Sequence, residues 1–245
     1  MDLSKYLEIN TGISPIILSC VHGGFKKPRR IPDKLIGPQI ADKNTYIIAK
    51  QIIKKLQHKS INIYYIFNKI HRSKVDLNRP PRSNAAFYQH SNEARSIHNA
   101  FHDQLIRFAQ ECVLKYKRCL LIDFHGFSKP YENYPDVIFG HIFGNTLALS
   151  LDLHKEDCTK YWGCFELHEE ISKRFILDDG LGYRDVNLAY SGGYITQQFY
   201  NKPNINAIQI ELAKYIRFDF DLSQRFINLI VAGITKSVLH YQKSS

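Results

Sequence analysis

The sequence predicts an α/β fold with a mixed, mostly parallel β-sheet flanked by helices on both faces. Short continuous apolar segments, typical of strands buried on both faces, alternate along the chain with segments whose apolar residues recur at helical spacing. This alternation is the pattern of parallel strands joined by helical crossovers. No repeat, low-complexity tract or linker interrupts it, so we expect residues 1–245 to form a single domain.

The expected elements follow from local pattern and turn residues. Apolar runs predict strands at residues 15–21, 61–67, 119–124, 137–143 and 206–212. Helical spacing predicts helices at residues 44–57, 92–116, 161–175 and 221–240. Ser91 or Asn92 can cap the second helix, with Glu93 in its first turn. The glycines after His22 and His125 are expected to end two of the strands, and residues 181–193 to form a loop.

Charge and cysteine usage limit the class of protein. The chain has 33 Lys and Arg against 23 Asp and Glu, and its net charge of +10 favours anionic partners without separating nucleic acid from a small acid. Its five cysteines form no C-x-x-C pair, and their odd number argues against a disulfide framework. Neither a secretory signal nor an apolar run of about 20 residues is visible. We therefore expect a cytoplasmic protein with no membrane contact.

Three polar residues lie where predicted strands end: His22, His125 and Glu211. Ligands of open α/β sheets collect beyond the carboxyl ends of the strands. A His-Gly step there can aim an imidazole into the crevice, so we predict both histidines as metal ligands, although either alone could be an ordinary loop histidine. A hydrolytic zinc site usually has three protein ligands and a water. An acidic third ligand is therefore expected.

The acidic ligand is expected to be Asp42, with Asp33 as the second choice. Asp42 precedes the helix predicted from residue 44, and capping of that helix explains it equally well. Asp123 lies two residues before His125, so on a strand both side chains share a face. Asp123 could orient the imidazole or form a salt bridge at the end of the strand.

Glu211 stands in an otherwise apolar strand, residues 208–212. A buried carboxylate is costly unless it is paired, linked to a metal or protonated. Beside a zinc ion it is suited to be the general base of amide hydrolysis. The alternative is an alternating strand in which Glu211 faces solvent.

The segment from His71 to Pro80 predicts an anion clamp. It sets Arg72 and Arg79 seven residues apart, with Asn78 beside the second, directly after a predicted strand. Guanidinium groups grip carboxylates at two points, which suits a small anion held in a fixed pose. Tyr194, in a glycine-containing segment, is a candidate hydrogen-bond donor to substrate, or part of a simple turn.

Six motifs, taken together and in order, resemble the N-formylglutamate amidohydrolase family. They are Val21-His22-Gly23-Gly24 with Ile31-Pro32-Asp33, Asp42-Lys43-Asn44-Thr45, Val75-Asp76-Leu77-Asn78-Arg79-Pro80, Asp123-Phe124-His125-Gly126, Gly192-Gly193-Tyr194-Ile195-Thr196 and Ala207-Ile208-Gln209-Ile210-Glu211-Leu212. Singly each motif is weak, but six in order are specific, and they extend over residues 15–212.

The family is similar in fold to the zinc carboxypeptidases and aspartoacylases, which implies a mixed, eight-stranded-type sheet between helices. The resemblance implies one bound zinc ion and assigns roles as follows: His22 and His125 as ligands, Arg72, Asn78 and Arg79 as the substrate clamp, and Glu211 as the base. Two positions depart from the relatives' pattern. Phe25 stands where carboxypeptidases and aspartoacylases have a ligand Glu, so the acid must come from elsewhere, and Gln197 stands where the deformylase has a basic residue.

The sequence thus predicts a zinc-dependent amidohydrolase, or one using another divalent metal, that acts on a small anionic N-acyl amino acid such as N-formylglutamate. In this hypothesis zinc polarises the amide, Glu211 is the base and Arg72 contacts a carboxylate or the oxyanion. A carboxypeptidase or peptide amidase acting on short peptides is the first alternative. The second alternative is a nucleic-acid-binding module, which the basic cluster at residues 26–30 favours. The third is a non-catalytic relative that binds a small acid.

Overall fold

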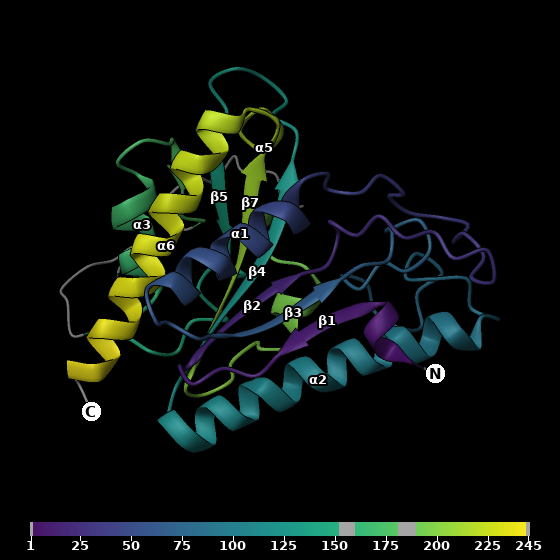
Figure 1. The fold of residues 1–245 in the computed structure, drawn as a ribbon, viewed down its shortest axis with the longest axis horizontal. Coiled ribbons are helices and arrows are strands. Elements are labelled where there is room, and N and C mark those ends of the chain that lie inside the picture. The colour runs from purple at the N-terminus through teal and green to yellow at the C-terminus, as the bar shows by residue number, and fades with distance from the viewer. Residues whose placement is uncertain (1, 152–159, 181–189, 244–245) are drawn as a thin grey trace.

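The computed structural model describes residues 2–151, 160–180 and 190–243, and within them a seven-stranded sheet forms the centre of the molecule (Figure 1). Its strand order is β1-β3-β2-β4-β7-β5-β6. The bounds are β1 (Leu7–Asn10), β2 (Ile16–Cys20), β3 (Tyr64–Asn68), β4 (Cys119–Phe127), β5 (Val137–Gly140), β6 (Leu177–Asp178) and β7 (Ile205–Ala213).

The sheet is mixed and mostly parallel, as predicted. Four of its six strand pairings are parallel, and the antiparallel ones join β1 to β3 and β5 to β7. The short strands β1 and β6 were not predicted. The resemblance implied an eight-stranded-type sheet, whereas the described residues form seven strands.

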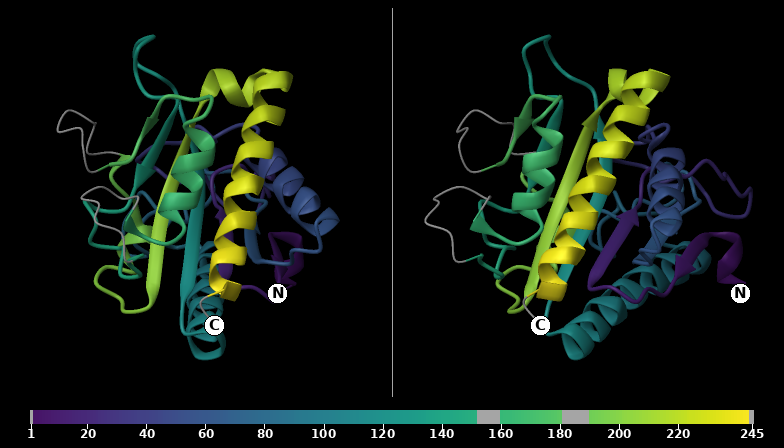
Figure 2. Two further views of the ribbon diagram at one scale, coloured as in Figure 1. Left: turned by 90° about the vertical axis from the view of Figure 1, so that its left-hand side faces the viewer. Right: turned by 60° about the vertical axis from the view of Figure 1, so that its left-hand side comes forward.

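Helices cover both faces of the sheet, which confirms the predicted architecture (Figure 2). Helices α1 (Thr45–His58), α3 (Cys164–Ile171) and α6 (Phe220–Lys243) pack on one face, and α2 (Asn92–Tyr116) packs on the other. Three short helices complete the described part: η1 (Leu3–Lys5), α4 (Tyr194–Gln197) and α5 (Lys214–Phe218). No helix in the described ranges combines the length and apolar character needed to cross a membrane.

The structure confirms one predicted helix cap and corrects two predicted boundaries. Ser91 does cap α2, because its hydroxyl accepts a hydrogen bond from the Ala94 amide at 3.2 Å. The helix predicted at 161–175 is limited to α3. Strand β4 continues through His125 and Gly126 to Phe127, because it stays paired with β7 over this whole length. Most of the predicted loop 181–193 lies outside the described residues.

Glycine at position 23 is required by close packing rather than by chain reversal. A Cβ atom there would lie 2.4 Å from the amide nitrogen of Tyr46, at the start of α1. The missing side chain therefore lets the segment after β2 pass directly against α1. This approach brings His22 beside the residues that precede that helix.

Alternation along the central strands separates polar from apolar side chains. In β4, Leu120, Ile122 and Phe124 join the core under α1, α3 and α6. Asp123 and His125 occupy the odd-numbered positions of the strand and therefore face the α2 side of the sheet. In β7 the same register places Gln209 opposite Asp123 and Glu211 opposite His125. The polar groups thus collect on one face, near the carboxyl ends of parallel strands.

Candidate active site

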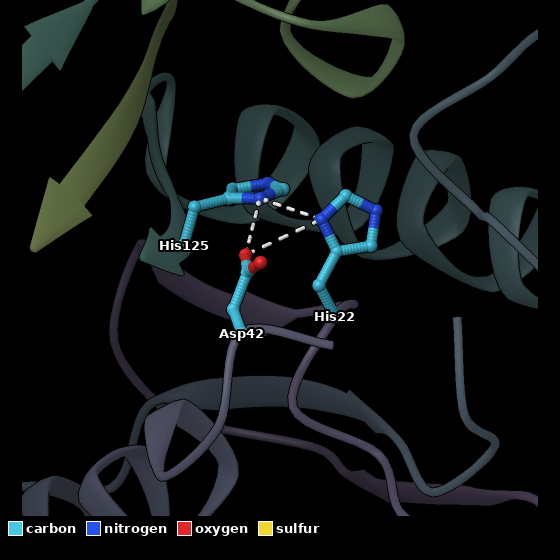
Figure 3. A group of neighbouring side chains, drawn as sticks. All are labelled: His22, Asp42 and His125. Carbon is cyan, nitrogen blue, oxygen red and sulfur yellow. Dashed lines mark hydrogen bonds and ion pairs between the residues drawn. The ribbon is translucent and has the colours of Figure 1, made fainter. Parts of the chain in front are cut away.

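His22, Asp42 and His125 converge from three separate segments (Figure 3). The Nδ1 atoms of the two imidazoles lie 3.1 Å apart. The Oδ2 atom of Asp42 lies 3.4 Å from Nδ1 of His22 and 3.6 Å from Nδ1 of His125. All three residues are buried, and their donor atoms lie within 4.8 Å of one another. Two imidazole nitrogens and one carboxylate oxygen in such a triangle form a donor set that suits a zinc ion.

Both imidazoles are oriented by carboxylates on their far sides. Nε2 of His22 lies 2.7 Å from Oδ1 of Asp76, and Nε2 of His125 lies 2.7 Å from Oδ2 of Asp123. A carboxylate can only accept, so each Nε2 is the donor in these contacts. With a metal ion bound, Nδ1 of each ring would offer its lone pair to the centre of the triangle. This carboxylate–imidazole arrangement is the usual support of metal-binding histidines. The contact expected between Asp123 and His125 is therefore present.

Asp42 does not cap α1. Asn44 occupies the N-cap position with a left-handed φ of 71° and makes no capping hydrogen bond with its side chain. The Asp42 carboxylate instead accepts a hydrogen bond from the Gly126 amide at 3.1 Å. Its main-chain N–H donates to the carbonyl of His22, which joins the two segments directly. The capping interpretation of Asp42 is wrong.

The two other positions considered for the acidic ligand lie apart from this cluster. Asp33 accepts a hydrogen bond from the Ser73 hydroxyl and pairs with Lys74, and its side chain is 56% exposed. Phe25 is largely exposed, with its ring against that of Tyr46. Among these candidates the structure brings only Asp42 to the histidines.

The carboxylates make the centre strongly attractive to positive charge. Burial alone would raise the pKa of Asp42, but hydrogen bonds to His125 and His22 hold it well below its usual value. Burial alone would lower the pKa of His125, and the Asp123 carboxylate raises it well above the ordinary value instead. A proton or a metal ion would each be stabilised at this position.

Glu211 is buried beside this cluster rather than exposed, so the solvent-facing alternative is wrong. Its Oε1 accepts a hydrogen bond from Nε2 of Gln209 at 2.9 Å, while Oε2 has no hydrogen-bond partner among the described residues. Burial is the main reason that the pKa of Glu211 is raised to about 7. A carboxylate with a free oxygen and a pKa near neutrality is suited to accept and return a proton.

The two predicted clamp arginines differ in their surroundings. Nε of Arg72 donates to Oδ2 of Asp76 at 2.8 Å, and its Nη1 lies 3.6 Å from Oδ1 of Asp42. Arg79 donates only to the carbonyl of Asn78 and forms no ion pair with any described carboxylate. Arg79 therefore has the guanidinium that is free to bind an anion, and Arg72 mainly neutralises the carboxylates.

Asn78 is buried and engaged with the protein itself. Its side-chain oxygen accepts from the amide of Ile195 at 3.0 Å, and its side-chain nitrogen lies 3.4 Å from Oε1 of Gln209. A Cβ atom at Gly193 would lie 2.1 Å from that nitrogen, so glycine is required where α4 begins. Asn78 thus attaches the start of α4 to the site.

Tyr194 is not brought to the cavity. Its ring packs on α2, with its centroid 5.2 Å from that of His102. Gln197 is exposed and also lies outside the cavity lining, so a basic residue at its position would not face the site in this conformation.

A cavity of about 240 Å³ gives access to these groups. Its walls carry the three converging residues, Glu211 and both arginines. The same small space therefore contains a candidate metal centre, a candidate base and a guanidinium without a carboxylate partner among the described residues, a combination that fits hydrolysis of an anionic substrate.

A comparison with known families assigns the chain. The sequence model of the N-formylglutamate amidohydrolase family matches residues 14–216. The chain belongs to this family. No match was found among curated proteins.

Solved structures agree with the family in fold. The N-formylglutamate amidohydrolase from Ralstonia eutropha JMP134 is 14% identical, with a TM-score of 0.67, and the match covers 96% of this chain and 98% of that one. A gene product of Agrobacterium tumefaciens is 12% identical, with a TM-score of 0.66 and coverage of 97% and 96%. Membership of the N-formylglutamate amidohydrolase family makes this chain a hydrolase that acts on amide C–N bonds.

Sequence reasoning assigned no role to three residues of the candidate site of this amidohydrolase. Asp76 supports His22, Gln209 joins Glu211 to the Gly193 amide, and Lys34 is fully buried with Nζ 3.5 Å from Oδ2 of Asp76. Asp76 stands inside the Val75–Pro80 motif, and Gln209 lies two residues before Glu211 on a strand and therefore shares its face. The sequence could have indicated both residues. Lys34 had none, because nothing local distinguishes it from a surface lysine.

Proposed function

We propose that the chain is a metal-dependent amidohydrolase that cleaves the amide bond of a small N-acyl amino acid, with N-formylglutamate as the first candidate substrate. The observation that carries this proposal is the convergence of His22, Asp42 and His125 in a cavity that also contains Glu211 and Arg79. Family membership supports the reaction class.

The proposed metal is one zinc ion, or another divalent ion, held by Nδ1 of His22, Nδ1 of His125 and the carboxylate of Asp42. The mixed nitrogen and oxygen donor set fits zinc, and the carboxylates behind both imidazoles support this choice. When bound, such an ion polarises an amide carbonyl and makes a water a better nucleophile at neutral pH.

The proposed general base is Glu211. Its Oε2, which has no hydrogen-bond partner in the described part of the chain, can accept the proton of the attacking water and then deliver it to the leaving amine. Gln209 holds the other oxygen, so the carboxylate keeps one orientation through both proton transfers.

The proposed clamp for the substrate α-carboxylate is Arg79. It lines the cavity without a carboxylate partner among the described residues. The backbone of this segment is held by two buried histidines of α2: Nε2 of His98 lies 2.9 Å from the Arg79 carbonyl, and Nε2 of His102 lies 2.9 Å from the Leu77 carbonyl. A fixed clamp positions the amide over the metal-binding residues, a major source of rate enhancement.

A test combines metal analysis with a substrate panel. Purified protein loaded with zinc and dialysed is expected to keep about one ion per chain, and His125→Ala is expected to lose it. His90→Ala, a change at an exposed histidine outside the cavity, is the control and should keep the ion. Stoichiometric zinc in the His125→Ala protein would contradict the ligand assignment.

The panel compares N-formylglutamate, N-acetylglutamate and short peptides. Hydrolysis of the N-acyl amino acids supports the proposal. Hydrolysis of peptides alone would favour the second candidate, a peptidase that uses the same centre. No turnover of any amide by zinc-loaded protein would indicate a non-catalytic relative.

A further inference from the structure

A second cavity adjoins the candidate active site. Its volume is about 480 Å³, twice the 240 Å³ of the inner cavity. Both cavities share five wall residues: Pro38, Asp42, Arg72, Gly126 and Phe127. Because Asp42 belongs to the candidate metal centre, the two spaces meet where the scissile amide would lie.

The outer cavity carries two exposed cations, Lys43 and Lys214. Neither ammonium group pairs with a carboxylate among the described residues, and Nζ of Lys214 lies 5.8 Å from the centroid of the Phe218 ring. The acidic member of the wall, Asp42, is already engaged with two histidines and Arg72. The outer cavity therefore has positive charge available for an anion.

The backbone around this cavity is held in place by Arg217. This buried guanidinium donates to the main-chain carbonyls of Lys43, Phe127 and Leu212, which belong to three different segments. Its charge is used within the protein, and the segment that carries Lys43 is fixed by it. Lys214 begins α5 directly after β7 (Figure 1). The segments around the cavity are thus tied together by one buried side chain.

The inner cavity holds the proposed carboxylate clamp, because Arg79 lines it and does not line the outer one. A substrate held by Arg79 with its amide at the metal-binding residues would direct its acyl group away from Arg79. The outer cavity is the adjoining space, and Ile40 and Phe127 give it apolar wall for methylene groups. A formyl group has no atoms to fill that space.

We propose, on the basis of the proposed function, that the outer cavity binds an acyl chain of several carbons that ends in a carboxylate. The methylene groups would pack between the apolar wall residues, and Lys43 and Lys214 would bind the terminal carboxylate. The preferred substrates would then be N-acyl amino acids with an anionic group on each side of the scissile amide.

Two synthetic amides whose acyl groups have the same number of carbon atoms separate the effect of acyl charge on binding from the effect of acyl size. N-glutaryl-glutamate ends in a carboxylate, and N-pentanoyl-glutamate ends in a methyl group. Binding is measured by titration calorimetry on zinc-loaded protein that carries Glu211→Gln besides any other change, so that neither amide is hydrolysed during the titration. Protein with both lysines is expected to bind the glutaryl compound about five- to tenfold more tightly, the scale for two partly exposed ion pairs. Equal affinities would overturn the inference.

Variants assign the preference to the two lysines. In Lys43→Gln/Lys214→Gln the ratio of the two dissociation constants should fall to about one. Lys54→Gln/Lys59→Gln removes the same charge at exposed positions of α1 and its end, outside both cavities, and should keep the wild-type ratio. An unchanged ratio in the first variant would also overturn the inference. If that variant does not fold, the wild-type ratio should still decrease as salt screens the exposed lysines, and a salt-independent ratio would count against the proposal.

Hydrolysis of N-formylglutamate, measured in parallel, tests the proposed function separately. Turnover of that substrate without discrimination between the two longer amides would refute the inference alone. Discrimination in binding without turnover of any amide would refute the proposed function and leave the anion-binding cavity supported.

Discussion

Asp123 and His125, two residues apart on β4, lie side by side on one face of the sheet, with Oδ2 of Asp123 2.7 Å from Nε2 of His125. The other carboxylate oxygen of Asp123 accepts a hydrogen bond from the hydroxyl of Ser19, which is its neighbour on β2. The imidazole is therefore supported by two adjacent strands of the sheet, and hydrogen bonds at the centre of the molecule set its orientation.

Asp123→Asn should weaken zinc binding by roughly 10- to 100-fold, because the neutral amide no longer makes His125 a more basic ligand. The measurement is competition for zinc with a chelator of known affinity. Asp103→Asn, at an exposed position of α2, is the matched control. Equal zinc affinity in the two variants would show that Asp123 does not support a metal ligand.

Arg79→Ala should raise KM for amides with a free α-carboxylate by roughly 10- to 100-fold, because a charge-assisted hydrogen bond to the substrate is lost. Amides of the same amino acids with a methyl-esterified carboxylate should be affected little. Arg82→Ala, three residues away and exposed, serves as the control. Similar effects of Arg79→Ala on charged and esterified substrates would argue against the clamp.

Arg72→Ala should differ from Arg79→Ala by affecting stability and kcat as well as KM. Arg72 lies against the carboxylates of Asp42 and Asp76, so its removal leaves their buried negative charge less fully compensated. We expect reduced thermal stability of the metal-free protein and a change in kcat as well as in KM. An effect on KM alone, as expected for Arg79→Ala, would mean that the two arginines act alike on the substrate.

Glu211→Gln should lower kcat by roughly 10²- to 10⁴-fold, because the amide cannot accept the proton of the attacking water. Its zinc content and KM should stay near those of the wild type, since Gln has the same shape and can still pair with Gln209. Gln224→Glu, the reverse exchange on α6 away from the cavity, controls for the handling of the variants. A variant with most of its activity would exclude Glu211 as the base.

The stability of the protein should fall with acid through His102. Burial lowers the pKa of His102 to about 3 in the folded protein, whereas an unfolded chain has a histidine pKa of about 6.5. The folded state then binds fewer protons than the unfolded state between these values. The contribution of His102 is complete above pH ~6.5 and decreases by up to about 1.4 kcal/mol per pH unit below it.

Denaturant unfolding at several pH values between 7 and 4 measures this slope. His102→Gln lacks the titrating group, so its free energy of unfolding should depend less steeply on pH than that of the wild type. His90→Gln, at an exposed position, should keep the wild-type slope. Parallel curves for the wild type and His102→Gln would contradict the prediction.

Local pattern was sufficient for the central elements. The runs at 15–21, 119–124 and 206–212 are apolar because their strands are covered on both faces, and β2, β4 and β7 form there. The local apolar pattern did not predict strands β1 and β6. Strand β1 is only four residues long, and β6 only two. Such short edge strands form because a neighbouring strand pairs with them. Pairing with a distant segment leaves no recognisable pattern in the few residues of the strand itself.

Residue type and position were informative at strand ends. His22, His125 and Glu211 are unusual where they stand, and the structure brings them to one cavity. Tyr194 was expected at the same site because of its chemistry. The direction of its side chain depends on how α4 is held by Asn78 and Gln209, and this directs the ring to α2.

The sequence by itself determined the fold class, the family motifs and the residues able to bind a metal, because each depends on local composition and order. Only the tertiary structure decided that Asp42 rather than Asp33 meets the histidines and that Asp76 and Lys34 stand behind His22. It also decided that Arg72 pairs with carboxylates whereas Arg79 pairs with none of those in the described ranges. These relations are set by the pairing of strands distant in sequence and by burial. A carboxylate or an ammonium group is the same chemical group wherever it occurs, and its partners and its distance from water define its role.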